Sequence, residues 1–477
     1  MGEADLKRII SLEKNSPFKR GRHHVALLYA APYRAGMASL GYLSVHRLFN
    51  EHPDFSCERA FSDLTGTDAS PLTLETGRPL NRFPVIAVSM AWELEVIEFI
   101  GIIKKAQIPV LQSERCHDDP LIIAGGPLTQ VVPSLLAPLA DIIFIGETEA
   151  SLPPFLDLLA TMPPRDELLQ RAAAMDGIYV PTIHSGAIPA SPAVPLSLLP
   201  AWSTFETPLG EFGAKSLIEV ERGCARACAF CVMSRKASAC TFRVVPPETI
   251  FSLLDPTPAS VGLVGAAVTD HPQIHAILEH FVNAGSEVSL SSLRADRVDE
   301  AMLDLLKRGG MKTLTVAADG PSERIRQSIS KGISGDQLID LAQRARLAGI
   351  GKMKLYQMAG FPREDDSDIR EMGQLLMDLS EKISLTVTVS PLVPKPSTPL
   401  ASAPFPPERQ IKSVLKNLKR AVKGRVIIRP VSWRDAALEY ALDQLGGEAV
   451  DELIDHVDNQ SSRGALVASL MGMLRHN

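Results

Sequence analysis

Three cysteines crowd into one short loop and carry the strongest chemical signal in the chain. Cys224, Cys228 and Cys231 are separated by three and then two residues, whereas the other three cysteines stand apart. Three thiolates from one loop can hold three irons of a cubane [4Fe–4S] cluster and leave the fourth iron open to a substrate or cofactor. Six cysteines in 477 residues do not make a disulfide framework, and in a reducing cytosol such a group of thiols indicates metal ligation.

Two other interpretations of the cysteine loop stay open at this point. A zinc site would need a fourth ligand, for which Cys240, His271 and His275 are the candidates. Zinc sites more often combine two close cysteine pairs, a pattern that this loop does not have. The thiols could also be buried and inert, although three cysteines at this spacing directly after a strand are an improbable coincidence.

The loop follows a predicted strand, and that strand opens a series of strand–helix repeats. The expected strands are 216–221, 260–264, 287–291, 312–317, 353–358 and 385–389. Helical patterns lie between them, for example at 274–282 and 337–347. Six repeats are two short of a full eight-unit barrel, so we expect a partial (β/α)6 barrel with the cysteine loop at the carboxyl end of its first strand, where barrel active sites lie.

The first part of the chain shows a second strand–helix series. Continuous apolar runs of four to six residues predict parallel strands buried on both faces, and an apolar stripe at 93–106 predicts a helix. The expected strands are 25–30, 85–90, 121–124 and 141–145. This alternation favours an open, doubly wound, Rossmann-like parallel sheet, which binds ligands beyond the carboxyl ends of its strands. No GxGxxG motif is present, so a dinucleotide is not indicated.

Four regions are expected along the chain, and together they make an α/β protein. They are a Rossmann-like domain at 1–160 with a lead-in helix at 1–20, a Pro- and Ala-rich linker at 161–210, the partial barrel at 211–402 and a small helical C-terminal segment at 403–477.

Composition and charge exclude several classes of protein. The chain has 49 Lys and Arg against 55 Asp and Glu, so its net charge of −6 does not indicate a nucleic-acid-binding surface. The basic helix at 412–425 is interpreted as a solvated face. The apolar stretch 85–103 is interrupted by three glutamates and the N-terminus has no apolar signal segment, so we expect a cytoplasmic enzyme without a membrane partner.

The cysteine loop resembles the CxxxCxxC loop of radical S-adenosylmethionine enzymes, in which an aromatic residue, here Phe230, precedes the third cysteine. The resemblance implies that Cys224, Cys228 and Cys231 ligate a [4Fe–4S] cluster whose open iron chelates the amino and carboxylate groups of S-adenosylmethionine. An electron from a low-potential donor such as flavodoxin or ferredoxin would then cleave the cofactor to methionine and a 5′-deoxyadenosyl radical, which abstracts hydrogen from an unknown substrate.

The same resemblance assigns further contacts to S-adenosylmethionine. In the family a Gly-Gly-Glu segment after the second strand receives the methionyl amino group, whereas this chain has Gly-Ala-Ala at 265–267, so backbone carbonyls would do that work. The residues implied for this cofactor are Phe230, Gly265, Ala266, Ser291, Ser292, Arg294, Asp319, Ser322 and Gly360.

The N-terminal domain resembles the cobalamin-binding-type domain that precedes many radical enzymes. The residues implied for cobalamin are Tyr33, Gly36, Gly125, Gly126, Gly146 and Glu147. The Asp-x-His-x-x-Gly motif that donates a histidine to cobalt is absent, so the lower face of the cobalt would be unligated or covered by an apolar residue. Alternatively, the domain binds nothing or caps the barrel.

These resemblances imply a radical S-adenosylmethionine enzyme, with cobalamin-dependent methyl transfer to an unknown substrate as the leading hypothesis. One alternative is a cobalamin-independent enzyme that modifies RNA or protein, like the methylthiotransferases, whose N-terminal domain ligates a second cluster with three cysteines. Here that domain offers only Cys57 and Cys116. The other alternative is a non-catalytic iron–sulfur protein.

Overall fold

The computed structural model describes residues 3–66, 70–234, 242–291 and 293–475, and it divides into two compact units. Unit 1 comprises Met1–Ser216 and Ala441–Asn477, and unit 2 comprises Leu217–Tyr440. Cys240 and Ser292 lie outside the described residues. No described helix combines the length and the hydropathy that crossing a membrane requires.

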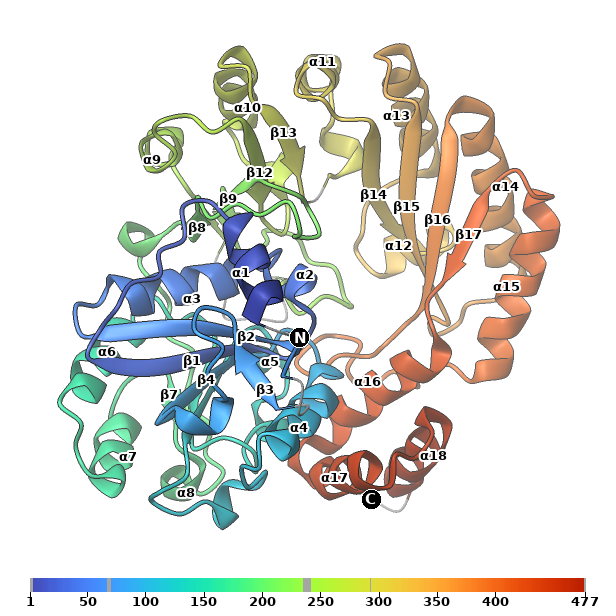
Figure 1. The fold of residues 1–477 in the computed structure, drawn as a ribbon. Coiled ribbons are helices and arrows are strands. Elements are labelled where there is room, and N and C mark those ends of the chain that lie inside the picture. The colour runs from blue at the N-terminus through green and yellow to red at the C-terminus, as the bar shows by residue number, and fades with distance from the viewer. Residues whose placement is uncertain (1–2, 67–69, 235–241, 292, 476–477) are drawn as a thin grey trace. The chain divides into compact units, whose positions relative to one another are not determined.

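Unit 1 is built on a seven-stranded sheet with the strand order β3-β2-β1-β4-β5-β6-β7 (Figure 1). The five central strands are parallel, and β3 and β7 are antiparallel at the two edges. The strands are β1 (His23–Tyr29), β2 (Phe55–Thr65), β3 (Pro71–Thr73), β4 (Val85–Ser89), β5 (Leu121–Gly125), β6 (Ile142–Phe144) and β7 (Ile178–Tyr179). The predicted doubly wound, Rossmann-like sheet is confirmed, and its strand order changes direction between β1 and β4.

Helices cover this sheet and explain the apolar runs of its strands. The predicted stripe forms α4 (Glu95–Lys105), which buries Val96, Phe99 and Ile100. The C-terminal helix α17 (Val450–Asn459) packs against α4. The remaining helices of unit 1 are α1 (Glu3–Ser11), α2 (Tyr33–Gly36), α3 (Leu40–Glu51), α5 (Leu128–Val131), α6 (Leu152–Ala160), α7 (Arg165–Ala173), α8 (Pro181–His184) and α18 (Arg463–Met473).

Unit 2 contains the six predicted strands of the second series, arranged in two sheets in which β12 and β13 are parallel and β14 to β17 are parallel. One sheet includes β9 (Ser216–Glu219), β12 (Ser260–Val264) and β13 (Glu287–Leu290) in the order β13-β12-β9. The other has β14 (Thr313–Asp319), β15 (Lys352–Ala359), β16 (Ser384–Pro391) and β17 (Ile427–Pro430) side by side. An isolated parallel bridge joins Leu293 to Val316. The described residues therefore form an open α/β array and no closed barrel.

The helices of unit 2 begin where the sequence supplies caps. Ser334 and Asp365 each form a capping box at the start of α13 (Gly335–Leu347) and α14 (Asp366–Lys382). In Figure 1, α13, α14 and α15 (Glu408–Val422) line one side of strands β14 to β17. The other helices are α9 (Pro247–Leu253), α10 (Ile274–Asn283), α11 (Glu300–Arg308) and α12 (Glu323–Ser328), while α16 (Trp433–Leu445) runs across the boundary at residue 440.

The structure divides the chain differently from the expected domains. The segment expected as a linker at 161–210 carries α7 and also β7, which pairs with β6 in the sheet of unit 1. The expected C-terminal segment is split, because α15 and β17 belong to unit 2 and α17 and α18 to unit 1. The segment 161–210 has the composition of a loop because it is rich in Pro and Ala. Strand β7 has only two residues and is too short to leave a periodic pattern.

Candidate functional site

The cysteine loop begins after β9 and the short strand β10 (Glu221–Arg222), which pairs antiparallel with β11 (Arg243–Val244). Gly223, just before the first cysteine, has φ +79°, a left-handed conformation that glycine adopts without strain. The loop then folds back on itself. Cys231 N donates to the carbonyl oxygen of Cys228, and the backbones of Cys224 and Ser234 form an isolated parallel β-bridge. The three cysteines therefore lie in one compact turn.

Backbone hydrogen bonds tie the cysteine loop to two distant segments of unit 2. Ala229 N donates to the carbonyl oxygen of Ile329 (2.9 Å), and Leu400 N donates to the carbonyl oxygen of Ala229 (3.2 Å). The Cys228 thiol lies 3.8 Å from the carbonyl oxygen of Ser330. The loop is thus held against the segment after α12 and the segment after β16.

The three thiols share a partly buried environment. Cys228 is buried, Cys224 and Cys231 are half-buried, and all three are free thiols. Burial raises the pKa of each thiol, and the other cysteines of the loop add to the rise for Cys228 and Cys231. A [4Fe–4S] cluster binds thiolates, so cluster binding must release the protons of the three thiols. The positive charge of the irons would then offset the repulsion between the thiolates.

The donor set fits a cubane cluster. Among the described residues, no three His, Cys, Asp or Glu side chains are gathered as they would be around a single metal ion. A cubane places its three cysteine ligands on three different irons, so the thiols need not converge on one point. The histidines considered for zinc have other partners: His271 bonds the carbonyl oxygen of Val245 (2.9 Å), and His275 pairs with Asp299 (3.0 Å).

Phe230 borders an apolar cluster next to the cysteine loop. The cluster is formed by the buried residues Ile325, Ile329, Phe361 and Leu392, with Ala229, Phe230, Met358 and Leu400 packed against it. Such a surface is suited to a flat, weakly polar ring. Gly360, expected beside adenine, has φ +91°, and a Cβ there would lie 2.4 Å from Pro406, so close packing with Pro406 also requires glycine.

The Gly-Ala-Ala turn is held by two side chains. The Ser291 hydroxyl accepts from Gly265 N (3.1 Å) and donates to the carbonyl oxygen of Gly265 (2.9 Å). Glu221 Oε1 accepts from Ala267 N (2.6 Å), and the Ala266 amide also bonds this carboxylate. A Cβ at Gly265 would lie 2.3 Å from Glu221 Oε1, so only glycine allows this approach.

Glu221 is a site residue that the sequence reasoning missed. It is fully buried, and burial raises its pKa to about 7. Its other oxygen, Oε2, has no hydrogen-bond partner within the described ranges. The available signal was an acid at the end of an apolar strand, directly before the cysteine loop.

The remaining residues implied for S-adenosylmethionine lie around the same loop but already have partners. Arg294 donates to Asp296 (3.0 Å) and to the carbonyl oxygen of Lys331 (3.2 Å). Asp319 forms an ion pair with Lys331 (2.6 Å), a residue that sequence reasoning also missed. Ser322 caps α12 by accepting from Ile325 N, and it donates to Asp368, so its hydroxyl is engaged in the fold.

The residues implied for cobalamin follow the parallel strands of unit 1 at their carboxyl ends. Tyr33 is buried, and its hydroxyl donates to Glu13 (2.6 Å) and bonds Thr207 (3.0 Å). A Cβ at Gly36 would lie 2.3 Å from the ring of Phe61. Both residues therefore have packing roles within the unit.

The glycines after β5 and β6 allow close backbone approaches. Gly126 has φ +106° and abuts the backbone of Met90, whereas Gly125 has space around its Cα. Gly146 has φ +77° and abuts Ser191. Its neighbour Glu147 accepts from Val194 N (3.2 Å), so the 191–194 segment covers this turn. Between these turns, Trp92 follows β4 and is 42% exposed, a feature that sequence reasoning missed.

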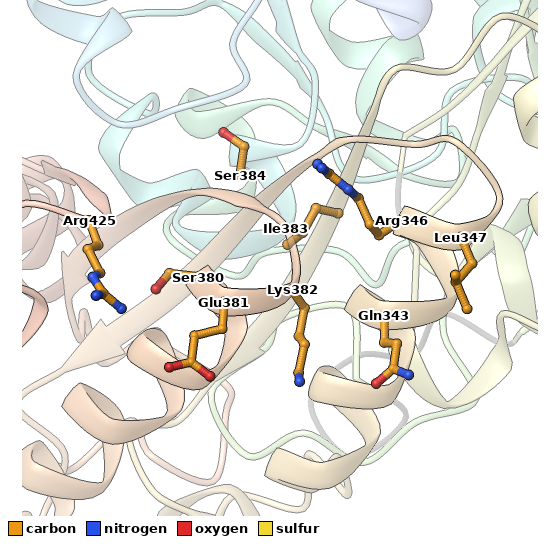
Figure 2. A pocket seen from close by; sticks show the side chains of 9 residues that line it. All are labelled: Gln343, Arg346, Leu347, Ser380, Glu381, Lys382, Ile383, Ser384 and Arg425. Carbon is orange, nitrogen blue, oxygen red and sulfur yellow. The ribbon is translucent and has the colours of Figure 1, made fainter.

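One cavity of unit 2 lies away from this chemistry. It measures about 420 Å³ and is lined by residues of α13 and α14, the start of β16 and Arg425 (Figure 2). Ser384 is the first residue of β16, whereas the cysteine loop follows the carboxyl end of β9. The cavity is therefore at the opposite end of the strands.

Two family models match the chain. The model described as "Radical SAM proteins, N-terminal" matches residues 41–181, and "Radical SAM superfamily" matches residues 218–376. The second range includes the cysteine loop and the strands from β12 to β15.

Relatives match over most of the chain. An uncharacterized protein of Methanocaldococcus jannaschii is 24% identical over 446 residues, which cover 92% of each chain. The structure of the radical S-adenosylmethionine methyltransferase TsrM from Kitasatospora setae, with cobalamin and a [4Fe-4S] cluster bound, matches with a TM-score of 0.59 and 14% identity over 95% of this chain and 100% of that one. A second TsrM structure, with tryptophan and an S-adenosylmethionine analogue, has a TM-score of 0.54 and 16% identity over 79% and 75%. The TsrM matches show a shared fold.

Proposed function

Because the chain belongs to the radical S-adenosylmethionine superfamily through its domain at residues 218–376, we propose that it holds a [4Fe–4S] cluster on Cys224, Cys228 and Cys231 and cleaves S-adenosylmethionine reductively. The observation that carries this proposal is the single folded loop that presents all three thiols at the end of the first strand of unit 2. When bound, the cluster would supply the electron that breaks a carbon–sulfur bond of the cofactor and yields a 5′-deoxyadenosyl radical.

The side chains around the loop bind and orient S-adenosylmethionine in this proposal. The apolar cluster at Phe230 and Gly360 receives the adenine, and the turn at Gly265 and Ala266 receives the methionyl amino group. Ser291 holds that turn through two hydrogen bonds to Gly265. Arg294 and Asp319 supply charges beside the loop, whereas the bonds of Ser322 to α12 and Asp368 make it a support for its neighbours.

We propose further that unit 1 binds cobalamin and that the reaction is a methyl transfer to a substrate whose identity is open. The support is the fold shared with TsrM, whose structure holds cobalamin and a [4Fe-4S] cluster. The carboxyl ends of β1, β4 and β5 meet at one edge of the sheet, where doubly wound folds bind ligands. Trp92 at that edge would offer an apolar ring for contact with a corrin, in keeping with the absence of a cobalt-ligating histidine motif.

The electron would come from a low-potential donor such as flavodoxin or ferredoxin, and the reaction would take place in the cytoplasm, where thiols stay reduced. Unit 1 would then bind cobalamin, and unit 2 would carry out the radical chemistry.

The test is anaerobic purification from cells supplied with cobalamin, followed by measurement of iron, cobalt and products. We expect about four irons per chain, near-stoichiometric cobalt, and 5′-deoxyadenosine when a reductant is added. Zinc in place of iron, or no S-adenosylmethionine cleavage by a loaded cluster, would contradict the radical chemistry. Iron without cobalt would contradict only the cobalamin proposal.

Single variants test the ligand assignment. Replacing Cys224, Cys228 or Cys231 by Ala should abolish both the cluster absorbance and the formation of 5′-deoxyadenosine, because a cubane with two protein ligands is not held. The matched controls are C116A, which removes an exposed thiol of unit 1, and C240A. Both should keep the cluster, and loss of iron in C240A would show that the ligand set is different.

A further inference from the structure

An ion pair lies beside the cysteine loop, between Lys331 and the end of β14. Lys331 Nζ lies 2.6 Å from Asp319 Oδ2, and the two side chains are 11% and 13% exposed. Asp319 ends β14 with φ +62°, next to an irregularity in the register with β15. A left-handed residue other than glycine at such a bulge is costly, and strand ends of this kind are often used to aim a side chain at a functional site.

The surrounding residues hold this pair in place. Gln357 is 1% exposed, and its amide, oriented to donate, bonds the carbonyl oxygens of Asp319 (3.2 Å) and Gly320 (3.0 Å). On the other side, Arg294 donates to the carbonyl oxygen of Lys331 (3.2 Å). Both members of the ion pair are therefore fixed through their backbones, so a ligand that binds the ammonium of Lys331 would cost little further order.

The pair lies close enough to the thiols to affect them. Lys331 directly follows Ser330, whose carbonyl oxygen faces the Cys228 thiol at 3.8 Å. Burial raises the pKa of Cys228, and the charge of Lys331 is the strongest effect that opposes this rise. Lys331 is thus a cation placed at the edge of the cysteine loop.

The ammonium group of Lys331 has donors to spare. A lysine ammonium carries three N–H donors, and in the described part of the chain Asp319 is its ion-pair partner. An incoming carboxylate can accept from the remaining donors without breaking the existing pair. The carboxylate of Asp319 meanwhile keeps the ammonium in one position.

We propose that Lys331 binds the carboxylate of the methionyl group of S-adenosylmethionine and that Asp319 is the positioning residue that aims it. This inference rests on the proposed function, in which the amino-acid end of the cofactor lies at the open iron beside the three thiols. The carboxylate of the cofactor would accept from N–H donors of Lys331. The ion pair thereby selects a cofactor that carries a negative charge at this end.

The experiment compares the binding of two compounds to the anaerobic, cluster-loaded full-length protein by equilibrium dialysis. One is S-adenosylmethionine, and the other is its decarboxylated analogue, which keeps the amino group. In K331M we expect the affinity for S-adenosylmethionine to fall about tenfold to a hundredfold, the range for a lost charged hydrogen bond, and the affinity for the analogue to stay within about twofold. K331R, which keeps the charge, should restore most of the affinity for S-adenosylmethionine.

The matched control is K307M, because Lys307 belongs to the same unit and its ammonium donates to the carbonyl oxygen of Gly349 on another part of the surface. It should bind both compounds like the wild type. Equal loss of both compounds in K331M, or loss of neither, would overturn the inference. If K331M takes up no cluster, K331Q is measured in its place, and unchanged selectivity there would overturn the inference equally. Wild-type protein with a full cluster that binds neither compound would instead contradict the proposed function.

Discussion

At the scale of single residues, Glu221 makes a contact with the 265–267 turn that the sequence of the turn does not reveal. The turn at 265–267 has no acid of its own, yet the buried carboxylate of Glu221 on β10 accepts from the amides of Ala266 and Ala267. The two partners are 46 residues apart in the chain, so only the fold brings them together. A buried carboxyl oxygen without a partner costs free energy, and such groups persist where function needs them.

This carboxyl predicts a pH-dependent stability. Its pKa is raised from 4.5 to about 7, first by burial and also by Glu219 and Asp270, so the native state binds a proton that the unfolded state has lost between these values. The contribution of this carboxyl to the free energy of unfolding is therefore fully present below about pH 4.5 and is lost as pH rises through about 7. In the metal-free chain, E221Q should raise the free energy of unfolding by about 3 kcal/mol at pH 8, and this gain should vanish near pH 4.5.

Denaturant unfolding at the two pH values measures this difference. The control is E219Q, because Glu219 forms two hydrogen bonds of 2.7 Å with Arg222 and its replacement should destabilise the protein. A gain for E221Q that is the same at both pH values would show that the carboxyl does not titrate as described.

At the scale of elements, apolar periodicity predicted those strands and helices whose burial is itself apolar. The strand expected at 260–264 is β12 with the same bounds, and the helical stripe at 93–106 forms α4. Strand β2 is not a continuous apolar run, because it buries Ser56, Glu58 and Arg59 beside its apolar residues. Strand β17 was missed for the opposite reason: its residues Ile427–Pro430 are mostly exposed. The three cysteines proposed as ligands stand out by their spacing in the sequence, whereas Glu221 and Lys331 depend on contacts between distant segments.

Helix α15, which packs against α14, offers a direct test of the packing in unit 2. Its apolar stripe, including Leu418 at 0% exposure, faces inward, and its basic residues face outward as predicted. L418A should lower the free energy of unfolding by about 2 to 5 kcal/mol, since it removes a fully buried side chain and leaves a cavity. K416A, on the exposed face of the same helix, should change it by about 0.5 kcal/mol or less. Similar effects of both variants in thermal unfolding would contradict this packing.

At the scale of the whole molecule, the segments expected as a lead-in and a linker are parts of the core of unit 1. Arg59 on β2 is buried and pairs with Glu13, which follows α1, at 2.7 Å and with Glu75 at 2.6 Å. Its guanidinium also lies 4.5 Å from the ring centre of Phe205. Three stretches far apart in the chain therefore meet at one charge, an arrangement that composition alone does not reveal.

Removing the charge of Arg59 should destabilise unit 1 as a whole. R59M leaves Glu13 and Glu75 buried without their cation, so we expect a loss of about 3 to 5 kcal/mol in the free energy of unfolding. The triple variant R59M/E13Q/E75Q, which buries no uncompensated acid, should recover much of this loss. R171M, which breaks an exposed pair with Glu167 on α7, should cost about 0.5 kcal/mol or less. Thermal unfolding of the full-length chain measures the stability of all three variants. A triple variant no more stable than R59M would mean that Arg59 holds the three segments by its packing and hydrogen bonds rather than by neutralising the two acids.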